Sequence, residues 1–140
     1  MTRLPRRAVA YLWAAPVSLP ALAVAVLGLA TGARARISGG VLEVGGGLLR
    51  PLLTRGVPGF SIGAITLGHV VLGAGAIELT ESRAHERVHV RQYERWGALF
   101  PFLYAAASLA ALARGRSVYA GNRFERQAER QTVSGDRRTA

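Results

Sequence analysis

The sequence predicts an α+β fold in which a small domain follows an N-terminal transmembrane helix. Residues 8–30 carry no charge and are predominantly apolar. Residues 41–44 and 60–72 are aliphatic segments bounded by glycine, which is typical of strands. Residues 80–96 and 122–131 have the flanking signals of helices. A chain of 140 residues is expected to form one such domain.

Composition restricts the possible metal ligands and partners. The chain has no cysteine, so disulfides and thiolate metal sites are excluded. The net charge is +10, and all 18 basic residues are arginine. Such a charge suits nucleic acid or an anionic membrane surface. The apolar N-terminal run favours the membrane, so we expect membrane lipid, and not nucleic acid, as a partner.

The apolar segment is expected to be a retained membrane anchor, residues 1–36. Residues 8–30 are long enough to cross a hydrocarbon core of about 30 Å as a helix. Pro16 and Pro20 are better tolerated in a membrane helix than in a soluble one. The alternative is a cleaved signal peptide, which would make the protein secreted. The segment is longer than the usual apolar region of a signal peptide, about 7–15 residues, which favours the anchor.

The middle of the chain is predicted to form short strands separated by turns. Residues 41–44 lie between glycine pairs and indicate a short strand. Residues 48–59 contain two prolines and are expected to be a loop or a short helix. Residues 60–72 alternate as in one long strand, which places His69 on the same face as aliphatic residues. Residues 73–75 then turn towards a helix, so the long strand could line a cleft and pair with an extended peptide.

The strongest motif is His85-Glu86-x-x-His89. Two histidines four residues apart lie one above the other on a helix, where both imidazoles can bind one tetrahedral metal ion, usually zinc. Glu86 lies about 100° round the helix from His85, at the edge of such a site. Its carboxylate can there accept a proton from a water molecule that the metal polarises. The motif therefore predicts a metal site with Glu86 as general base.

The helix that carries this motif has predicted ends and a basic face. Thr80 or Ser82 is expected to cap its start, and Gly97 its end. Arginines recur every fourth residue on the side opposite the histidines, at Arg83, Arg87, Arg91 and Arg95. A solvated basic face is the simplest interpretation, and contact with lipid phosphates is the alternative.

The C-terminal part is predicted to add two helices. Residues 98–113 are apolar but short for a complete membrane crossing. Residues 122–131 are expected to form a polar helix, and residues 132–140 a disordered basic tail. If residues 98–113 crossed the membrane, the polar helix would lie on the opposite side from His85 and His89. A metal site shared by the two helices therefore requires the apolar segment to be buried or interfacial.

Two histidines leave a catalytic zinc site one protein ligand short, and a carboxylate is the expected third. The candidates are Glu43, Glu78, Glu81, Glu94, Glu125, Glu129 and Asp136. Glu94 lies on the arginine side of its helix and points away. Glu125 and Glu129 are four residues apart, so one could bind the metal while the other accepts a hydrogen bond from a ligand histidine. Asn122-x-x-Glu125 also fits a capping box, which would give Glu125 a structural role.

The pair of motifs His85-Glu86-x-x-His89 and Glu125-x-x-Ala128-Glu129 resembles the gluzincin metallopeptidases, and is most similar to the membrane-bound HtpX and CaaX-processing type. The resemblance implies a minimal zincin-like domain over residues 37–131, built from a small sheet, the motif helix, an apolar helix and a ligand helix. It implies that the zinc ligands are His85, His89 and Glu125, that Glu86 is the general base, and that Glu129 stands where the family has an Asp that supports the ligands.

The resemblance also implies an activity and a place. The expected protein is a zinc peptidase anchored in the bacterial inner membrane and acting on a peptide or protein. The chain departs from the family in its short length, in Glu129 replacing Asp, and in lacking a clear transition-state donor, for which Tyr119 and His69 are the candidates. The alternative is a non-catalytic membrane protein with a structural or vestigial metal site. A di-iron carboxylate site would need a second Glu-x-x-His, which the sequence does not contain.

Overall fold

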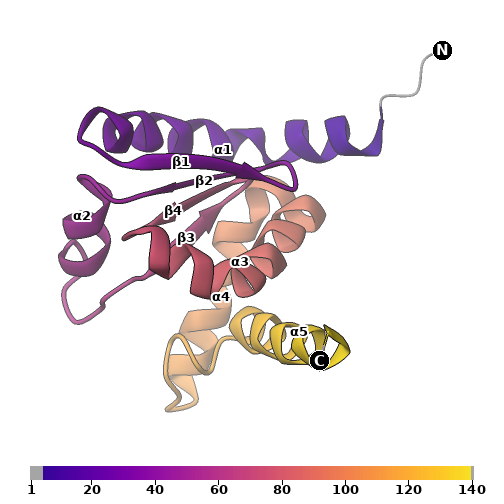
Figure 1. Ribbon diagram of the computed structural model, residues 1–140. Coiled ribbons are helices and arrows are strands. Elements are labelled where there is room, and N and C mark those ends of the chain that lie inside the picture. Colours follow the sequence, from indigo (N-terminus) through magenta and orange to yellow (C-terminus); the bar gives the residue numbers. More distant parts are fainter. Residues whose placement is uncertain (1–4, 140) are drawn as a thin grey trace.

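The structure is a computed structural model that describes residues 5–139, with side chains through Asp136. Its elements in chain order are α1 (Arg6–Ala30), β1 (Arg34–Ser38), β2 (Val41–Gly45), α2 (Leu49–Arg55), β3 (Ala64–Leu67), β4 (Val70–Gly73), α3 (Ala76–Trp96), the 3₁₀ turn η1 (Gly97–Leu99), α4 (Phe100–Ala113) and α5 (Arg123–Thr139) (Figure 1). This arrangement confirms the mixed α+β class, the small sheet and the apolar N-terminal helix.

Four strands form one sheet in the order β1-β2-β4-β3. β2 and β4 pair in parallel, and the two outer strands are antiparallel to their neighbours. β3 is therefore an edge strand, and α3 packs beside it. The sequence did not predict β1, because this strand has no buried face and hence no alternating apolar pattern.

Residues 60–72 do not form the single strand that their alternation predicted. They contain the hairpin β3–β4, whose register pairs Leu67 with Val70. Gly68 turns the chain with a φ of +68°, a left-handed conformation that glycine adopts without steric cost. His69 consequently lies in the turn and not on the strand face where the sequence placed it.

Helices cover both faces of the sheet (Figure 1). α1 presents small residues to one face, where Ala21 and Ala25 pack with Val44. α3 covers the other face through Leu79 and Val90. A third cluster of buried side chains joins α1 to α3, α4 and α5. The sheet and the start of α1 thus hold α3, the motif helix, in a defined position.

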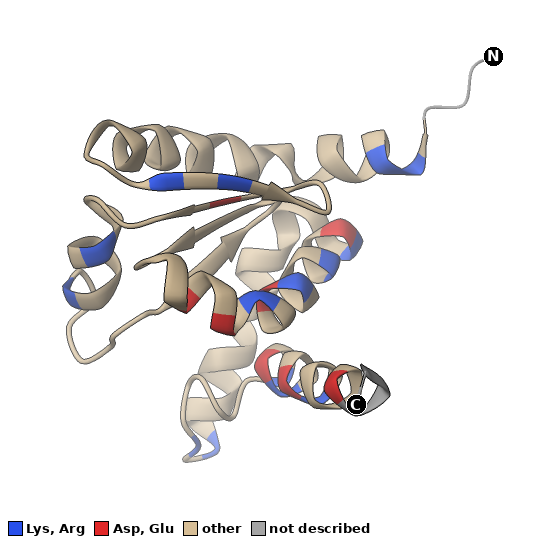
Figure 2. Cartoon of the chain, viewed as in Figure 1, with Lys and Arg blue, Asp and Glu red and all other residues tan. Residues whose placement is uncertain are grey.

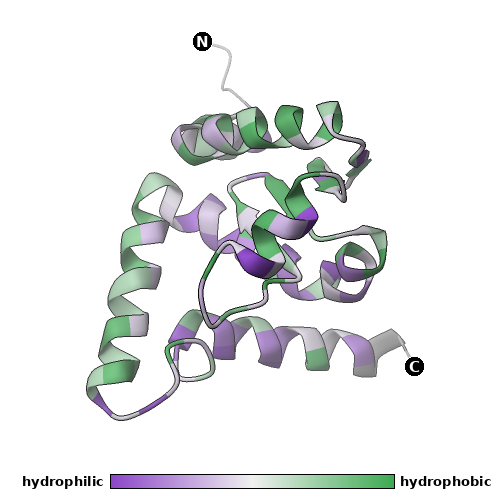
Figure 3. Ribbon diagram, turned by 90° about the vertical axis from the view of Figure 1, so that its left-hand side faces the viewer, coloured by the Kyte–Doolittle hydropathy of each residue, from purple (hydrophilic) through white to green (hydrophobic). Residues whose placement is uncertain are grey.

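Two helical segments are long and apolar enough to cross a membrane, namely Arg6–Ala30 and the continuous run Ala76–Ala113 formed by α3, η1 and α4. This assignment follows from the length and the composition of the helices alone. A signal sequence near an N-terminus meets the same criteria. The ribbons of α1 and α4 are largely hydrophobic (Figure 3). Large apolar side chains that are exposed on these two helices include Leu12, Leu19, Val26, Phe102 and Leu109.

The motif helix begins earlier than the sequence predicted. α3 starts at Ala76, and Thr80 and Ser82 donate their hydroxyls to carbonyls one turn back within the helix instead of capping it. The missed turn has no Ser, Thr, Asp or Asn at its start, because the residue before Ala76 is a glycine. The predicted end is confirmed, since Gly97 follows the helix with a φ of +54°.

The last helix, α5, is longer than expected. The Phe124 N–H donates to Asn122 Oδ1 over 2.9 Å, which confirms Asn122 as the N-cap. Residues 132–139, expected to be a disordered tail, continue the helix as far as Thr139. They contain no proline, and once a helix is nucleated each further residue adds one hydrogen bond.

The arginine stripe of α3 is not a uniform solvated face. Figure 2 shows basic residues recurring along α3 and an acidic residue within the sheet. The first two arginines of the stripe bind Glu43, a buried carboxylate on β2. Arg83 makes a bidentate contact, with Nε 2.9 Å from Oε1 and Nη2 2.9 Å from Oε2, and Arg87 Nη2 lies 3.2 Å from Oε1. This ion triad ties α3 to the centre of the sheet, while Arg91 and Arg95 further along the helix stay exposed.

We expect Glu43→Gln to lower the free energy of unfolding by about 2–4 kcal/mol, because two part-buried guanidiniums lose their carboxylate. The hydrogen bond from Arg83 holds the pKa of Glu43 below its ordinary value of 4.5. The wild type therefore has this stability in full above pH 4.5 and loses it as the pH falls through the lower folded-state pKa.

Urea unfolding of the detergent-solubilised protein, followed by circular dichroism from about pH 3 to about pH 8, measures this difference. The gap between wild type and Glu43→Gln should be widest near neutral pH and should narrow in acid. Glu81→Gln, which neutralises an exposed carboxylate of α3, is the control. An equal effect of the two substitutions would contradict the role of the triad.

Candidate metal centre

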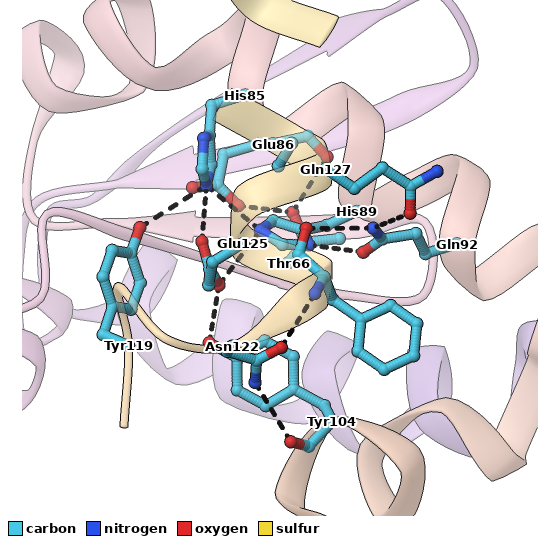
Figure 4. A network of polar contacts seen from close by, with 12 residues as sticks. Thr66, His85, Glu86, His89, Gln92, Tyr104, Tyr119, Asn122, Glu125 and Gln127 are labelled. Carbon is cyan, nitrogen blue, oxygen red and sulfur yellow. Dashed lines mark hydrogen bonds and ion pairs between the residues drawn. The ribbon is translucent and has the colours of Figure 1, made fainter. Parts of the chain in front are cut away.

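Four side chains from two helices converge beside β3 (Figure 4). α3 supplies His85, Glu86 and His89, and α5 supplies Glu125. His85 Nε2 lies 3.1 Å from His89 Nε2 and 3.0 Å from Glu125 Oε2, and His89 Nε2 lies 3.3 Å from Glu125 Oε1. The three predicted ligands therefore form a group, with donor atoms within 4.8 Å of one another, that could hold a metal ion.

The spacing of these donor atoms fits a tetrahedral ion. With metal–ligand bonds of about 2.0–2.1 Å, the edges of a tetrahedron are about 3.3–3.4 Å long. The closest contacts within the group, 3.0, 3.1 and 3.3 Å, are near that length. Two imidazoles and one carboxylate are also a common ligand set of catalytic zinc sites.

Gln92 determines which nitrogen of His89 carries the proton. Gln92 Nε2 donates to the Phe124 carbonyl over 3.2 Å and to Gln127 Oε1 over 3.0 Å, so its Oε1 faces the imidazole. His89 Nδ1, 2.8 Å away, must donate to that oxygen. A neutral His89 then directs the lone pair of Nε2 at the Glu125 carboxylate. Two acceptors face each other there, and a cation between them, a metal ion or a proton, makes the contact favourable.

Glu125 is a buried and oriented carboxylate. Tyr104 on α4 donates its hydroxyl to Oε1 over 2.5 Å. Burial alone would raise the pKa of Glu125, but contacts with the protonated forms of His85 and His89 and the hydrogen bond from Tyr104 outweigh it and hold that pKa below its usual range. The side chain does not complete a capping box, because the backbone N–H of Asn122 donates to a carbonyl. Glu125 therefore faces the histidines as an ionised group.

Glu86 lies between the histidine pair and the edge of the sheet. Its side chain is 6% exposed, and Thr66 on β3 donates Oγ1 to Glu86 Oε2 over 2.7 Å. No other side chain in the described part of the protein donates to this carboxylate. Oε1 therefore remains available to a molecule that enters the adjoining cleft.

A cleft of about 410 Å³ opens over these residues. Its walls are largely apolar and include Phe60, Ile62, Phe100, Pro101 and Val118. β3 forms one rim. The Gly63 carbonyl accepts a hydrogen bond from the Ala74 N–H over 2.8 Å, so the backbone of residue 63 faces β4. In an antiparallel pair, alternate residues face the partner strand. The backbone N–H and C=O groups of Ala64 and Thr66 therefore face away from β4, towards the outer edge of the sheet.

His69, a candidate for the site, lies outside the cleft. Its Nε2 is 3.2 Å from Glu94 Oε1, and its ring packs on Tyr11 with centroids 4.2 Å apart. The hairpin turn at Gly68 carries His69 to this position. Glu94, expected to point away from the histidine pair, accordingly contacts His69 and not the metal ligands.

Tyr119, the other candidate donor, does line the cleft, and its hydroxyl lies 3.5 Å from His85 Nε2. Glu129 is exposed one turn beyond Glu125, and its support of the ligands stays a prediction. The orienting residues Thr66, Gln92 and Tyr104 were not predicted. Gln92 could have been found, because it follows His89 by three residues and so lies near it on the helix.

We expect Gln92→Leu to weaken zinc binding about 10–100-fold, because His89 loses the acceptor that fixes its tautomer. Competition against a zinc-binding dye measures the affinity, with circular dichroism to verify folding. Gln131→Leu is the matched control, since Gln131 lies on α5 and contacts Arg91 rather than a ligand. Equal zinc affinities of the Gln92 variant and the control would refute the orienting role.

Comparisons with models of known protein families, with curated proteins and with solved structures found no match. The function of the protein is therefore inferred from the candidate metal centre. It contains two imidazoles and a carboxylate spaced for one ion. A further buried carboxylate and an apolar cleft along a strand edge adjoin them.

Proposed function

We propose that this protein is a membrane-associated, zinc-dependent peptidase of the gluzincin type with a minimal zincin-like fold. The observation that carries the proposal is the convergence of His85, His89 and Glu125 beside Glu86, in the wall of a cleft that β3 borders. Three protein ligands and an open side are characteristic of a catalytic site, whereas structural zinc sites are closed by a fourth protein ligand.

The zinc ion would be held by His85 Nε2, His89 Nε2 and a carboxylate oxygen of Glu125. When bound, zinc supplies a Lewis acid that polarises a carbonyl and lowers the pKa of water. Gln92 accepts a hydrogen bond from His89 Nδ1, and Tyr104 donates one to Glu125 Oε1. Each of these contacts orients one of the proposed ligands. The donors are thus oriented before the ion arrives, which reduces the reorganisation that binding requires.

Glu86 is the general base of the proposed reaction. Thr66 occupies Oε2, which leaves Oε1 to take a proton from the attacking water. The hydroxyl of that water adds to the carbonyl carbon of the substrate. The same carboxyl then returns the proton to the amide nitrogen as the C–N bond breaks, so that a carboxylic acid and an amine are formed.

The substrate is a peptide or protein segment in extended conformation. Its backbone would pair with the outward groups of Ala64 and Thr66 on β3. The apolar walls of the cleft favour apolar side chains near the cleaved bond. The Tyr119 hydroxyl, 3.5 Å from His85 Nε2, would donate to the carbonyl oxygen as negative charge develops there.

We infer attachment to the cell membrane, the inner membrane in a bacterium, through the exposed apolar side of α1. α4 does not separate the ligands across a bilayer. Ser108 Oγ on α4 donates to the Val118 carbonyl over 2.9 Å, so the chain returns beside α4 before α5 begins. His85 and Glu125 therefore meet on one side of the membrane, as the proposed site requires.

We expect the purified protein in detergent to hold about one zinc ion per chain and to lose most of it in His85→Ala and in Glu125→Ala. Elemental analysis measures the content, and Glu81→Ala is the control for loss of a carboxylate. Zinc lost only from the histidine variant would remove Glu125 from the ligand set. No zinc in the wild type after reconstitution would overturn the proposal.

We expect Glu86→Gln to reduce peptide hydrolysis by about 10²–10⁴-fold and to leave the zinc content unchanged, because only the proton acceptor is lost. Mass spectrometry of a peptide library rich in apolar residues detects the cleavage, and Glu81→Gln is the control. Full activity of Glu86→Gln would exclude this residue as base. A zinc-loaded wild type that cleaves no peptide would favour the alternative, a non-catalytic membrane protein with a structural metal.

A further inference from the structure

A second hollow, of about 540 Å³, lies between α3 and α5 and shares no lining residue with the cleft. Four arginines line it, Arg91 and Arg95 from α3 and Arg123 and Arg130 from α5. None of its lining residues is a carboxylate. We call this hollow the arginine groove.

The contacts of these arginines orient them without neutralising them. Arg91 Nη2 donates to Gln131 Oε1 over 3.1 Å, the guanidinium of Arg95 lies 5.3 Å from the ring centroid of Trp96, and that of Arg123 lies 4.7 Å from the ring centroid of Phe124. Among the residues whose side chains are described, none of the four arginines forms an ion pair. Within the part of the chain whose side chains are described, the four positive charges of the groove therefore have no carboxylate partner.

The first half of α3 shows how the same chain neutralises arginines when their role is structural. Arg83 and Arg87 share the buried carboxylate of Glu43. One and two turns further along the same helix, Arg91 and Arg95 face α5, which contributes two more arginines and no acid to the groove. Gathering like charges around one hollow costs electrostatic free energy, which a bound anion offsets.

We propose that the arginine groove binds a ligand with two phosphate groups. A guanidinium presents a planar fork of donors that matches phosphate oxygens. A phosphate monoester carries a charge of about −1.5 to −2 and a phosphodiester about −1, so four guanidiniums exceed the charge of one phosphate and provide two guanidiniums for each of two phosphates. Gln92 and Gln127 lie among the lining residues and add polar groups. A diphosphate ester in solution and a lipid headgroup with two phosphates share this chemistry.

The proposal for this groove does not rest on the proposed peptidase activity, although the groove adjoins the candidate metal centre. Gln92 lines the groove and also holds His89 Nδ1. The bound ligand would therefore lie one side chain away from a candidate metal ligand.

Isothermal titration of the full chain in neutral detergent with inorganic pyrophosphate at low salt tests the proposal. We expect saturable binding of about one ion per chain, weakened at least about tenfold in the double variant Arg95→Gln/Arg130→Gln. The matched control is Arg114→Gln/Arg116→Gln, which removes the same charge from an exposed loop that lines neither hollow. The control should retain the wild-type affinity within about twofold.

Vesicle sedimentation distinguishes the two sources of phosphate. Phosphatidylcholine vesicles containing cardiolipin, which has two phosphates per lipid, are compared with vesicles of equal charge containing phosphatidylglycerol. A preference for cardiolipin that the groove variant loses identifies a lipid headgroup. Loss of pyrophosphate binding in that variant, with vesicle binding unchanged, identifies a soluble diphosphate. Both outcomes support the groove.

Three outcomes would overturn the proposal that the arginine groove binds a ligand with two phosphates. Equal weakening in the groove variant and the loop variant would show a general effect of net charge. Pyrophosphate binding that survives in the groove variant but disappears in His85→Ala would place the ion at the candidate metal centre. Binding of a short DNA duplex, lost in the groove variant, without any binding of pyrophosphate would assign the groove to nucleic acid.

Discussion

The structure depends on one buried polar contact, in which α5 places the Glu125 carboxylate against the two histidines of α3. A carboxylate in that position is costly unless every side of it is satisfied. Tyr104 on α4 donates to one oxygen, and a cation shared with the two imidazoles, a metal ion or a proton, satisfies the side that faces α3. The requirement fixes three helices relative to one another, so the geometry of the site and the packing of the helical layer have the same origin.

Two further contacts keep this arrangement in place. Asn122, which is fully buried, caps α5 and donates to the Tyr104 carbonyl and to Ser108, so it sets where the helix that carries Glu125 begins. The Glu43 ion triad holds the opposite side of α3 to the sheet. The ion pairs with Glu43 therefore fix one side of the motif helix, and the hydrogen bonds of the proposed ligands fix the other. A metal ion would bind side chains that these contacts already orient.

Much of the fold could be predicted from the sequence, and the errors have physical reasons. The long apolar helix and the motif helix were evident from composition and periodicity. The prediction of one strand over residues 60–72 was wrong because the alternation of side chains continues through Gly68. Only the backbone conformation of that glycine shows that the chain reverses there. β1 was missed because a strand with two exposed faces has no pattern. The predicted end of α5 was too early because the polar residues from 132 onwards were expected to be disordered.

The candidate site was predictable where its chemistry follows one helix, and less so where it depends on the fold. The spacing of His85 and His89 fixed that pair, and the resemblance to gluzincins selected Glu125 from seven carboxylates. Thr66 and Tyr104 could not be found, because they reach the site from a strand and a helix that no sequence spacing connects to the motif. His69 was misplaced for the same reason as the strand that was expected to carry it.

The small side chains on α1 have a consequence for how the protein can sit at a membrane. Ala21 and Ala25 pack directly on the sheet, and a Cβ on Gly28 would come within 2.9 Å of Leu49. A perpendicular crossing that kept this contact would carry the open edges of the sheet into hydrocarbon, where their backbone groups would have no partners. If α1 attaches the protein to a membrane as proposed, this packing favours a helix that lies along the surface with its outer side in the lipid. Cleavage after residue 30 would uncover the face of the sheet on which Ala21 and Ala25 pack, so the folded domain would lose part of its core together with this segment.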